Sequence, residues 1–409
     1  MKFWLITLFE TIPSDENRPT RFMEIADNLI AHGHKVTLWT STFFHAIKAH
    51  RFSEDTEYEV KSGYHVICLK SWGYKKNISL MRIFAHRHFM NRLKKRIQKE
   101  ERPDAILVAL PPLSVADTIT LYAVRNKIPV IVDIIDPWPD AFLTIVPQQF
   151  RSIFKFVLGP VYSQTKRILL RATGISAIGE KYLEWSEKYT SGQVKKCAVF
   201  YPAVNIDAYD QKVKEFGHIE KKHYEPPYLF VYAGGLGAAY DVETIVECAR
   251  LLESDGYEKA KFIIAGSGPK YDFLVKSAKG LNNVEITGFL GAGDLARLYA
   301  KSHVGIACYS NRATQAVTYK FFDYMGAGLC IINSLQGEMS NIIERENVGY
   351  NYLANNPQEL VNIVRFLCEN TNVIKITGEN ARKYTEAKGD SKHVYSEMTE
   401  FLTSFGNMK

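Results

Sequence analysis

The stretch AILVALPPLSVADTITLYAVRNKIPVIVDII, residues 105–135, decides the fold class. It begins and ends with an apolar run of strand length, and residues 114–126 between the runs have a helical pattern. Continuous apolar runs are typical of parallel strands that are buried on both faces of a sheet. The stretch therefore predicts a strand, a crossover helix and a second parallel strand, which is the repeating unit of α/β proteins.

The same alternation extends over the rest of the chain. In the first half the patterns predict further strands, among them one over 59–70, and helices over 19–33 and 79–101. The second half repeats the scheme from Tyr228 onward. We therefore expect an α/β fold of two Rossmann-like domains in tandem, facing across a cleft. The expected parts are a domain over 1–205, a linker over 206–227, a domain over 228–390 and a C-terminal helix over 391–409 that can cross back to the first domain.

Composition restricts the class of partner. The 409 residues carry a net charge of +7, which suits anionic ligands or an anionic membrane surface and does not by itself imply nucleic acid. The six cysteines form no CxxC pair, so we expect small buried hydrophobes in a reducing compartment, and no metal site. No apolar run reaches the length of a membrane-spanning helix. The expected location is cytoplasmic, with peripheral attachment to the inner face of the cytoplasmic membrane left open.

Glycine-rich turns follow two strands of the second half. The sequences YLFVYAGGLG (228–237) and AKFIIAGSGP (260–269) each run from a strand into such a turn. Backbone amides and the next helix N-terminus could bind a phosphate there. Glycines are also common in turns that bind nothing, and neither turn matches a dinucleotide-binding or P-loop motif.

The stretch TQAVTYKFFDYMGAGLCIINS, residues 314–334, combines a polar lead-in, a helix and a strand. Lys320 and Asp323 stand three residues apart, so they share one helical face. A cation in the first turn opposes the helix dipole, which suggests an anion to bind. The alternative is an ordinary surface ion pair worth a few tenths of a kcal/mol, and the pattern alone does not choose between them.

Several motifs in order resemble retaining GT-B glycosyltransferases of the family-four type, in particular the bacterial surface-polysaccharide subgroup. VTYKFFDYMGAGLCII resembles the carboxylate helix of that family, RPDAILVALPP and PVIVDIIDPWPD resemble its first-domain strands, and YAGGLG, FIIAGSGP and VEITGFL resemble its second-domain turns. The resemblance covers nearly the whole chain. It implies a nucleotide-diphosphate sugar as donor, with a UDP-sugar as one example, a saccharide or polyprenyl-linked acceptor, and no metal or other cofactor.

The resemblance also assigns roles to residues. Asp323 matches the acid that binds the nucleotide ribose, and Lys320 is expected at the diphosphate, where it would serve catalysis. The remaining residues expected at the donor are Gly234, Gly235, Gly237, Gly266, Lys270, Arg312 and Glu338.

Three departures from the family pattern concern the donor site. Gln315 stands where the family has its first acid, and Gly235 and Tyr240 stand where many members have Arg and Lys. The usual glycine pair of the first loop is replaced by PSDENRPTR (13–21). The diphosphate charge must then be met by other cations, for which Lys320, Lys270 and Arg312 are the candidates.

In the first half, Asp136 follows a strand in DIIDPWPD, and the family region it matches supplies a polar residue near the reacting sugar. An Asp before Pro is equally common as a turn residue. His45, Lys48 and Arg51 are candidates for contact with an acceptor phosphate.

The helix expected over 79–101 is strongly basic between residues 82 and 102. Its apolar stripe is expected to pack on the sheet. The charges around it, among them Lys94, Lys95 and Arg96, fit an anionic membrane surface or plain solvation.

Taken together, the sequence predicts a glycosyltransferase of surface polysaccharide synthesis, such as O-antigen or capsule. A nucleotide-sugar 2-epimerase of the same fold and a catalytically degenerate binding or scaffold subunit are the alternatives.

Overall fold

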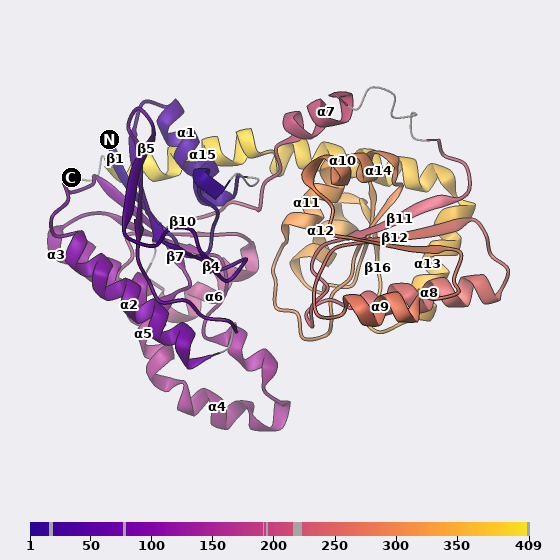
Figure 1. Cartoon of the computed structure of the whole chain (residues 1–409), viewed down its shortest axis with the longest axis horizontal. Coiled ribbons are helices and arrows are strands. Elements are labelled where there is room, and N and C mark those ends of the chain that lie inside the picture. Colours follow the sequence, from indigo (N-terminus) through magenta and orange to yellow (C-terminus); the bar gives the residue numbers. More distant parts are fainter. Residues whose placement is uncertain (16–18, 77–78, 191, 194, 216–222, 407–409) are drawn as a thin grey trace. The chain divides into compact units, whose positions relative to one another are not determined.

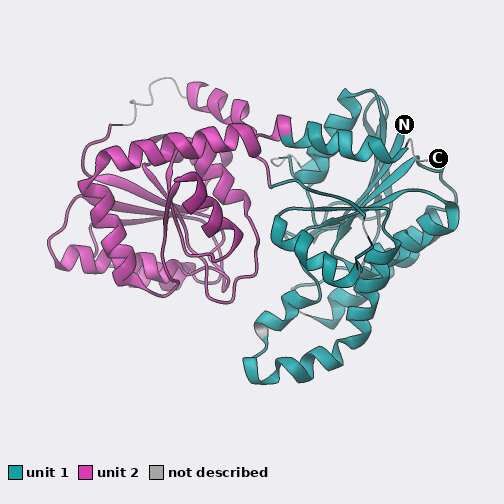
Figure 2. Cartoon of the chain, turned by 180° about the vertical axis from the view of Figure 1, so that it is seen from behind, with its two compact units in different colours: residues 1–201, 394–409 teal, residues 202–393 magenta. Residues whose placement is uncertain are grey.

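The computed structural model describes residues 1–15, 19–76, 79–190, 192–193, 195–215 and 223–406. The chain forms two compact units, residues 1–201 with 394–409, and residues 202–393 (Figure 2). Each unit contains a mostly or wholly parallel sheet with helices on both of its faces (Figure 1). This is the α/β architecture that the sequence predicts.

Unit 1 is built on an eight-stranded sheet in the order β10-β9-β8-β7-β1-β2-β6-β5. Its strands are parallel except for the pair β5 and β6. The strands are β1 (Lys2–Ile6), β2 (Lys35–Ser41), β5 (Thr56–Lys61), β6 (Tyr64–Leu69), β7 (Ala105–Leu110), β8 (Val130–Ile134), β9 (Gly174–Ala177) and β10 (Lys196–Val199), with β3 (Phe43–Phe44) and β4 (Ala49–His50) as a separate pair. The single strand expected over 59–70 is wrong, because Ser62 and Gly63 turn the chain and make β5 and β6 a hairpin.

The helices of unit 1 lie on the two faces of this sheet. In Figure 1, α1 lies on one face and α2, α3 and α5 lie on the other. The helices are α1 (Arg21–Ala31), α2 (Leu80–Arg96), α3 (Leu113–Asn126), α4 (Arg151–Val157), α5 (Gly159–Arg171) and α6 (Glu180–Thr190), with the 3-10 helices η1 (Pro13–Asp15), η2 (Asp140–Ile145) and η3 (Gln148–Phe150). Sequence patterns miss α4 and α5, which insert between β8 and β9.

Unit 2 has a six-stranded sheet in the order β13-β12-β11-β14-β15-β16, and its strands are parallel. They are β11 (Tyr228–Ala233), β12 (Ala260–Ala265), β13 (Val284–Gly288), β14 (Val304–Ala307), β15 (Cys330–Asn333) and β16 (Gly349–Asn351). Its helices are α7 (Ile206–Glu215), α8 (Val242–Ser254), α9 (Tyr271–Ser277), α10 (Ala292–Lys301), α11 (Tyr319–Gly326), α12 (Glu338–Glu346), α13 (Pro357–Glu369) and α14 (Thr371–Lys388). The last helix, α15 (Ser391–Gly406), lies mostly in unit 1.

The described part of the expected linker, 206–227, differs from a plain connection. Residues 206–215 form α7, and the stretch belongs to unit 2. The C-terminal helix α15 begins in unit 2 and belongs to unit 1 from Val394 on. Its Phe405 ring lies so close to Gly174 that a Cβ there would meet it at 2.3 Å. This packing is what a helix that crosses back to the first domain requires.

Candidate functional site

The strand order of unit 2 places a ligand site before any side chain is considered. The chain runs outward from β11 to β12 and β13, and then returns to the other side of β11 with β14. At such a reversal the turns after the two central strands diverge and leave a crevice at the carboxyl ends of the strands. The turn after β11 and the loop after β14 both lie there, and each contains residues that the sequence assigns to the donor.

The glycine turns after β11 and β12 are packed against one another. Gly234 N donates to Ala265 O at 3.0 Å, and a Cβ on Gly266 would lie 1.8 Å from Gly234 O. Gly266 is therefore required by this close approach, and the Gly234 amide is already bonded. Gly237 has open space around its Cα, so this part of the turn is where a ligand has room.

The helix α11 begins at Tyr319, with Thr318 as its N-cap. Tyr324, buried on its inner side, accepts a hydrogen bond from Ala233 N at 2.7 Å. Gly305 on β14 leaves room for the Tyr324 ring, since a Cβ there would meet the ring at 2.6 Å. These contacts, made by the second turn of α11, hold the helix and its first turn against the end of β11.

Lys320, in that first turn, is directed toward the turn after β11. Its Nζ lies 4.1 Å from the ring centroid of Tyr232, 4.2 Å from that of Tyr240 and 5.5 Å from that of Tyr309. The residue as a whole is half-buried, but the Nζ itself is buried and has no hydrogen-bond partner among the described residues. A Cβ on Gly234 would meet this Nζ at 2.7 Å, so glycine at 234 keeps space beside the ammonium.

Burial lowers the pKa of Lys320 from 10.5 to about 8, and the neighbouring Cys308 and Asp323 offset only part of that effect. The three rings solvate the cation in part, since each presents a negative π-face. Rings cannot replace the hydrogen bonds that an ammonium group loses on burial. An anion at this position would supply them.

The other donor residues predicted from the sequence have less uniform settings. Lys270 Nζ donates to Tyr240 O at 2.7 Å and to Glu243 Oε2 at 2.8 Å, so it holds the turn after β11 to α8. Arg312 is exposed in the loop after β14. Asp323 is half-buried on α11, and Glu338 is half-buried at the start of α12. Among these cations, Lys320 is the one with a buried, unpartnered donor group.

Gln315 is a second buried polar group in this region without a partner. Its Oε1 is buried and accepts no hydrogen bond from any residue that the structure describes. It stands in the loop that leads into α11, in place of the acid expected from the family pattern. The loop itself is fixed, because Tyr309 Oη and Thr318 Oγ1 lie 2.7 Å apart in a hydrogen bond.

In unit 1, residues from four segments meet at the carboxyl end of the sheet. His45 Nδ1 lies 2.6 Å from Tyr74 Oη, and Lys48 Nζ donates to His45 O at 2.7 Å. The Arg82 guanidinium, from the first turn of α2, lies 5.8 Å from the Tyr74 ring and 5.1 Å from the Trp138 ring. We name His45, Lys48, Tyr74, Arg82, Asp136 and Trp138 the unit 1 cluster.

Charge in the unit 1 cluster is mostly positive. Burial and the cations Lys48 and Arg82 lower the pKa of His45 to about 4, so this imidazole is neutral near pH 7. Burial also lowers the pKa of Lys48 and of Arg82 and raises that of Asp136. The Asp136 carboxylate accepts from Trp138 Nε1 at 2.9 Å. Two cations against one carboxylate leave the cluster suited to a further anion.

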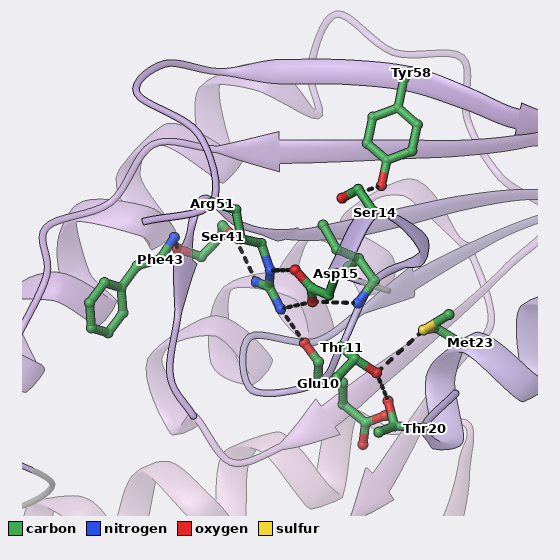
Figure 3. Close-up of polar contacts among 11 residues, drawn as sticks. Glu10, Thr11, Ser14, Asp15, Thr20, Met23, Ser41, Phe43, Arg51 and Tyr58 are labelled. Carbon is green, nitrogen blue, oxygen red and sulfur yellow. Dashed lines mark hydrogen bonds and ion pairs between the residues drawn. The ribbon is translucent and has the colours of Figure 1, made fainter. Parts of the chain in front are cut away.

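Arg51, the third residue predicted at the acceptor, lies in a different setting (Figure 3). Its Nε and Nη2 donate to the Asp15 carboxylate at 2.7 Å each, and Nη2 also donates to Glu10 O at 2.7 Å. Nη1 donates to Ser41 O at 3.2 Å. The Arg51 and Asp15 side chains are 4% and 6% exposed. Arg51 thus fastens the loop after β1, and its donors are occupied by the protein.

The sequence interpretation missed two features of these sites. The tyrosines around Lys320 come from the end of β11, the turn after it and the loop after β14, and only the fold brings them together. Arg82 had a detectable signal: it shares the helix face of the buried His86, Phe89 and Leu93 at helical spacing. A cation on an otherwise inward face is a candidate for a buried role.

The stripe expected to pack along α2 does so only in part. Phe89, Leu93 and Ile97 are buried, but Ile83 and Phe84 are 61% and 51% exposed. Arg92 pairs with Asp55, and Arg96 pairs with Glu57 and Glu100. These two charges are therefore partly neutralised within the protein.

Among the described residues, no group of three or more His, Cys, Asp and Glu side chains is arranged to hold a metal ion. In the same residues, each helix is too short or too polar to span a bilayer.

Residues 227–370 match the family model described as Glycosyl transferases group 1. No curated protein sequence matches the chain significantly. Among solved structures, sucrose-phosphate synthase from Thermosynechococcus elongatus matches with a TM-score of 0.74 at 12% identity, over 100% of both chains. Anabaena HepE in complex with UDP matches with a TM-score of 0.67 at 13% identity, over 99% of this chain and 100% of that one. WaaG, a glycosyltransferase involved in lipopolysaccharide biosynthesis, matches with a TM-score of 0.64 at 13% identity, over 98% of this chain and 100% of that one.

Proposed function

We propose that this chain, whose residues 227–370 match the Glycosyl transferases group 1 model and whose fold is that of GT-B enzymes, is a glycosyltransferase that transfers a sugar from a UDP-sugar with retention of configuration. The acceptor is a saccharide or polyprenyl-linked saccharide of a bacterial surface polysaccharide, such as O-antigen or capsule. HepE has been solved with UDP and with UDP-glucose, which supports the donor class. WaaG is involved in lipopolysaccharide biosynthesis, which supports the acceptor class.

The main support for the proposal is the Lys320 ammonium group, which is buried at the point where the strand order of the unit 2 sheet reverses. A donor diphosphate there would accept hydrogen bonds from Lys320 Nζ, whose low-dielectric setting strengthens the interaction. The open space at Gly237 gives the diphosphate room. Asp323, three residues along α11, would accept hydrogen bonds from the ribose hydroxyls.

The proposed reaction takes place on one face of the donor sugar. The bond from the anomeric carbon to the diphosphate breaks, and the acceptor oxygen bonds to the same carbon from the same side. The acceptor proton passes to the leaving diphosphate. Lys320 stabilises the charge that develops on the diphosphate, and Asp136 lies in the acceptor unit as a polar group for the reacting sugar.

The acceptor is proposed to bind the unit 1 cluster. His45, Lys48 and Arg82 surround a region whose net charge favours an anion, as in a phosphate-linked acceptor. Arg51 is replaced in this role by Arg82, because the Arg51 donors are occupied by Asp15 and two carbonyl groups.

A thermal-shift panel with UDP, GDP, ADP, CMP and dTDP tests the donor part. A ligand that binds only the folded chain raises its melting temperature. We expect the largest shift with UDP, and a smaller one in Asp323→Ala, which loses about 1–3 kcal/mol of binding if the ribose contact exists. An equal shift in Asp323→Ala would reject the ribose contact.

One alternative has an observation in its favour. Gln315 lacks the charge of the family's first acid, and its buried Oε1 has no hydrogen-bond partner among the described residues, as expected of a degenerate subunit that binds without turnover. Release of free UDP from UDP-sugars in the presence of lipid-linked acceptor separates the two. Binding of UDP without release under any donor would favour the degenerate subunit.

A further inference from the structure

Exposed apolar side chains gather at two places in unit 1. At the start of α2, Leu80, Met81, Ile83 and Phe84 are 73%, 49%, 61% and 51% exposed. At η3 and α4, the corresponding values for Phe150, Ile153, Phe156 and Val157 are 52%, 65%, 86% and 64%. None of the α4 residues is buried. Most of the apolar side chains of α4 therefore remain in contact with solvent, and an exposed apolar patch of this kind is typical of an interaction surface.

The two places are joined through the unit 1 cluster. Arg82, between the exposed residues of α2, lies over the Trp138 ring, and Trp138 packs on Phe142 with ring centroids 4.6 Å apart. Phe142 belongs to η2, against which α4 packs. Figure 1 shows α4 at the outer edge of unit 1, beyond α5. We name the exposed residues of α2, η3 and α4 the apolar edge.

The sequence around the apolar edge has no acidic residue over two long stretches. Residues 60–99 carry eleven Lys and Arg and no Asp or Glu, and residues 141–179 carry five and none. The exposed basic residues beside the apolar edge include Lys75, Lys76, Arg87, Arg151 and Lys155. Apolar and aromatic groups flanked by cations are the pattern of a segment that lies in the interface of an anionic bilayer.

We infer that the apolar edge docks on an anionic lipid surface, with α4 and the first turn of α2 entering the headgroup region. This docking places the unit 1 cluster, whose Arg82 lies within the α2 turn, at the membrane. This docking deepens the proposed function and rests on it, because a polyprenyl-linked acceptor resides in a bilayer. A second copy of the chain is disfavoured as occupant, because it would oppose Arg151 and Lys155 with like charges.

This location differs from the basic half of α2. There an open groove of about 470 Å³ is lined by Asp55, His88, Arg92 and Lys99 among others. Arg92 and Arg96 in this groove already pair with carboxylates. The one apolar residue among the described residues that line the groove, Leu69, is buried, so the groove exposes no large apolar side chain. The docking surface therefore centres on α4, not on residues 92–99.

Cosedimentation of the full chain with vesicles tests this inference. We expect binding to phosphatidylcholine vesicles in which about one lipid in three is phosphatidylglycerol, and weaker binding to phosphatidylcholine alone or at high salt. Ile153→Ser/Phe156→Ser should reduce binding about tenfold or more, because these side chains leave water on docking. Arg151→Gln/Lys155→Gln should reduce it about fivefold for each charge.

The control is Phe273→Ser/Ile376→Ser, which makes the same chemical changes at residues of unit 2 that are 58% and 53% exposed. It should bind vesicles like the unaltered chain. Equal binding by the Ile153→Ser/Phe156→Ser variant, or equal binding to neutral and anionic vesicles, would overturn the inference. A dimer in sedimentation velocity that this variant dissociates would overturn it in favour of a second copy. UDP binding, measured on the same samples, reports separately on the proposed function.

Discussion

Arg21 in unit 1 and Lys320 in unit 2 occupy similar places and meet different neighbours. Each lies in the first turn of a helix at the carboxyl end of its sheet. Arg21 donates from Nε and Nη2 to the Asp133 carboxylate at 2.7 and 2.9 Å, and from Nη1 to Phe200 O at 2.8 Å. Lys320 Nζ faces three tyrosine rings and has no acceptor among the described residues.

The difference teaches what each cation is for. The Arg21 and Asp133 side chains are 1% and 0% exposed, and they satisfy one another inside the protein. Such a pair serves the fold, because removing either partner leaves an uncompensated buried charge. A buried ammonium without a partner destabilises the fold, and we propose that a bound anion offsets this cost at Lys320.

The largest effect is expected from Arg21→Met. It leaves the Asp133 carboxylate buried without its partner, which costs about 3–5 kcal/mol of unfolding free energy. Urea unfolding, followed in unit 1 by tryptophan fluorescence, measures the loss. The double variant Arg21→Met/Asp133→Leu removes both charges and should recover most of it. A loss below about 1 kcal/mol in the single variant would show that this pair does not stabilise the fold.

The opposite sign is expected from Lys320→Met. Methionine keeps an apolar stem and removes a buried charge, so the unfolding free energy at pH 7 should rise by about 1–3 kcal/mol. Because all five tryptophans lie in unit 1, urea unfolding of unit 2 is followed by far-UV circular dichroism, with Lys270→Met as the matched control. Lys270 is paired with Glu243 and should lose stability instead. A large loss of stability in Lys320→Met would place Lys320 among the structural cations.

The pH dependence of stability should carry the mark of Lys320. The folded-state pKa is lowered from 10.5 to about 8, so between these values the unfolded chain binds more protons. Stability therefore gains up to about 1.4 kcal/mol per pH unit as pH rises from 8 toward 10.5, and the penalty is fully present below pH 8. Because other groups titrate in this range, the difference between the unaltered chain and Lys320→Met is the measured quantity. If the difference in unfolding free energy between the two proteins did not change with pH, the lowered pKa of Lys320 would be contradicted.

The smallest effect is expected at the tyrosine rings. Tyr240→Leu removes one ring from Lys320 Nζ and should cost about 0.5–1 kcal/mol of unfolding free energy at pH 7. Tyr240→Phe keeps the ring and should cost less. The comparison of the two by thermal melting isolates the ring, and equal losses would assign the effect to the hydroxyl group.

The sequence predicted most of the fold, for reasons that particular residues make clear. Apolar runs such as 105–110 and 130–134 identify parallel strands because both faces of each strand are buried. The hairpin of β5 and β6 was missed because its polar outer strand lacks such a run. The helix α4 was missed because its exposed apolar residues give no amphipathic pattern for packing within the chain.

The candidate site was less predictable than the fold. The spacing of Lys320 and Asp323 suggested an anion or an ion pair equally, and the choice depended on the tyrosine rings that tertiary structure brings to Lys320. The roles of Gly266 and Arg51 depended on neighbours far along the chain, namely Gly234 O and Asp15. Local patterns contain no information on such contacts.

The central claim is that Lys320 binds the donor diphosphate, and calorimetric titration with UDP tests it most directly. The account predicts that the unaltered chain binds UDP, and that Lys320→Met loses about 1.5–3 kcal/mol of binding free energy, the worth of a hydrogen bond to a charged group. The variant should still melt at or above the temperature of the unaltered chain. Equal affinity for UDP in the two proteins would contradict the account.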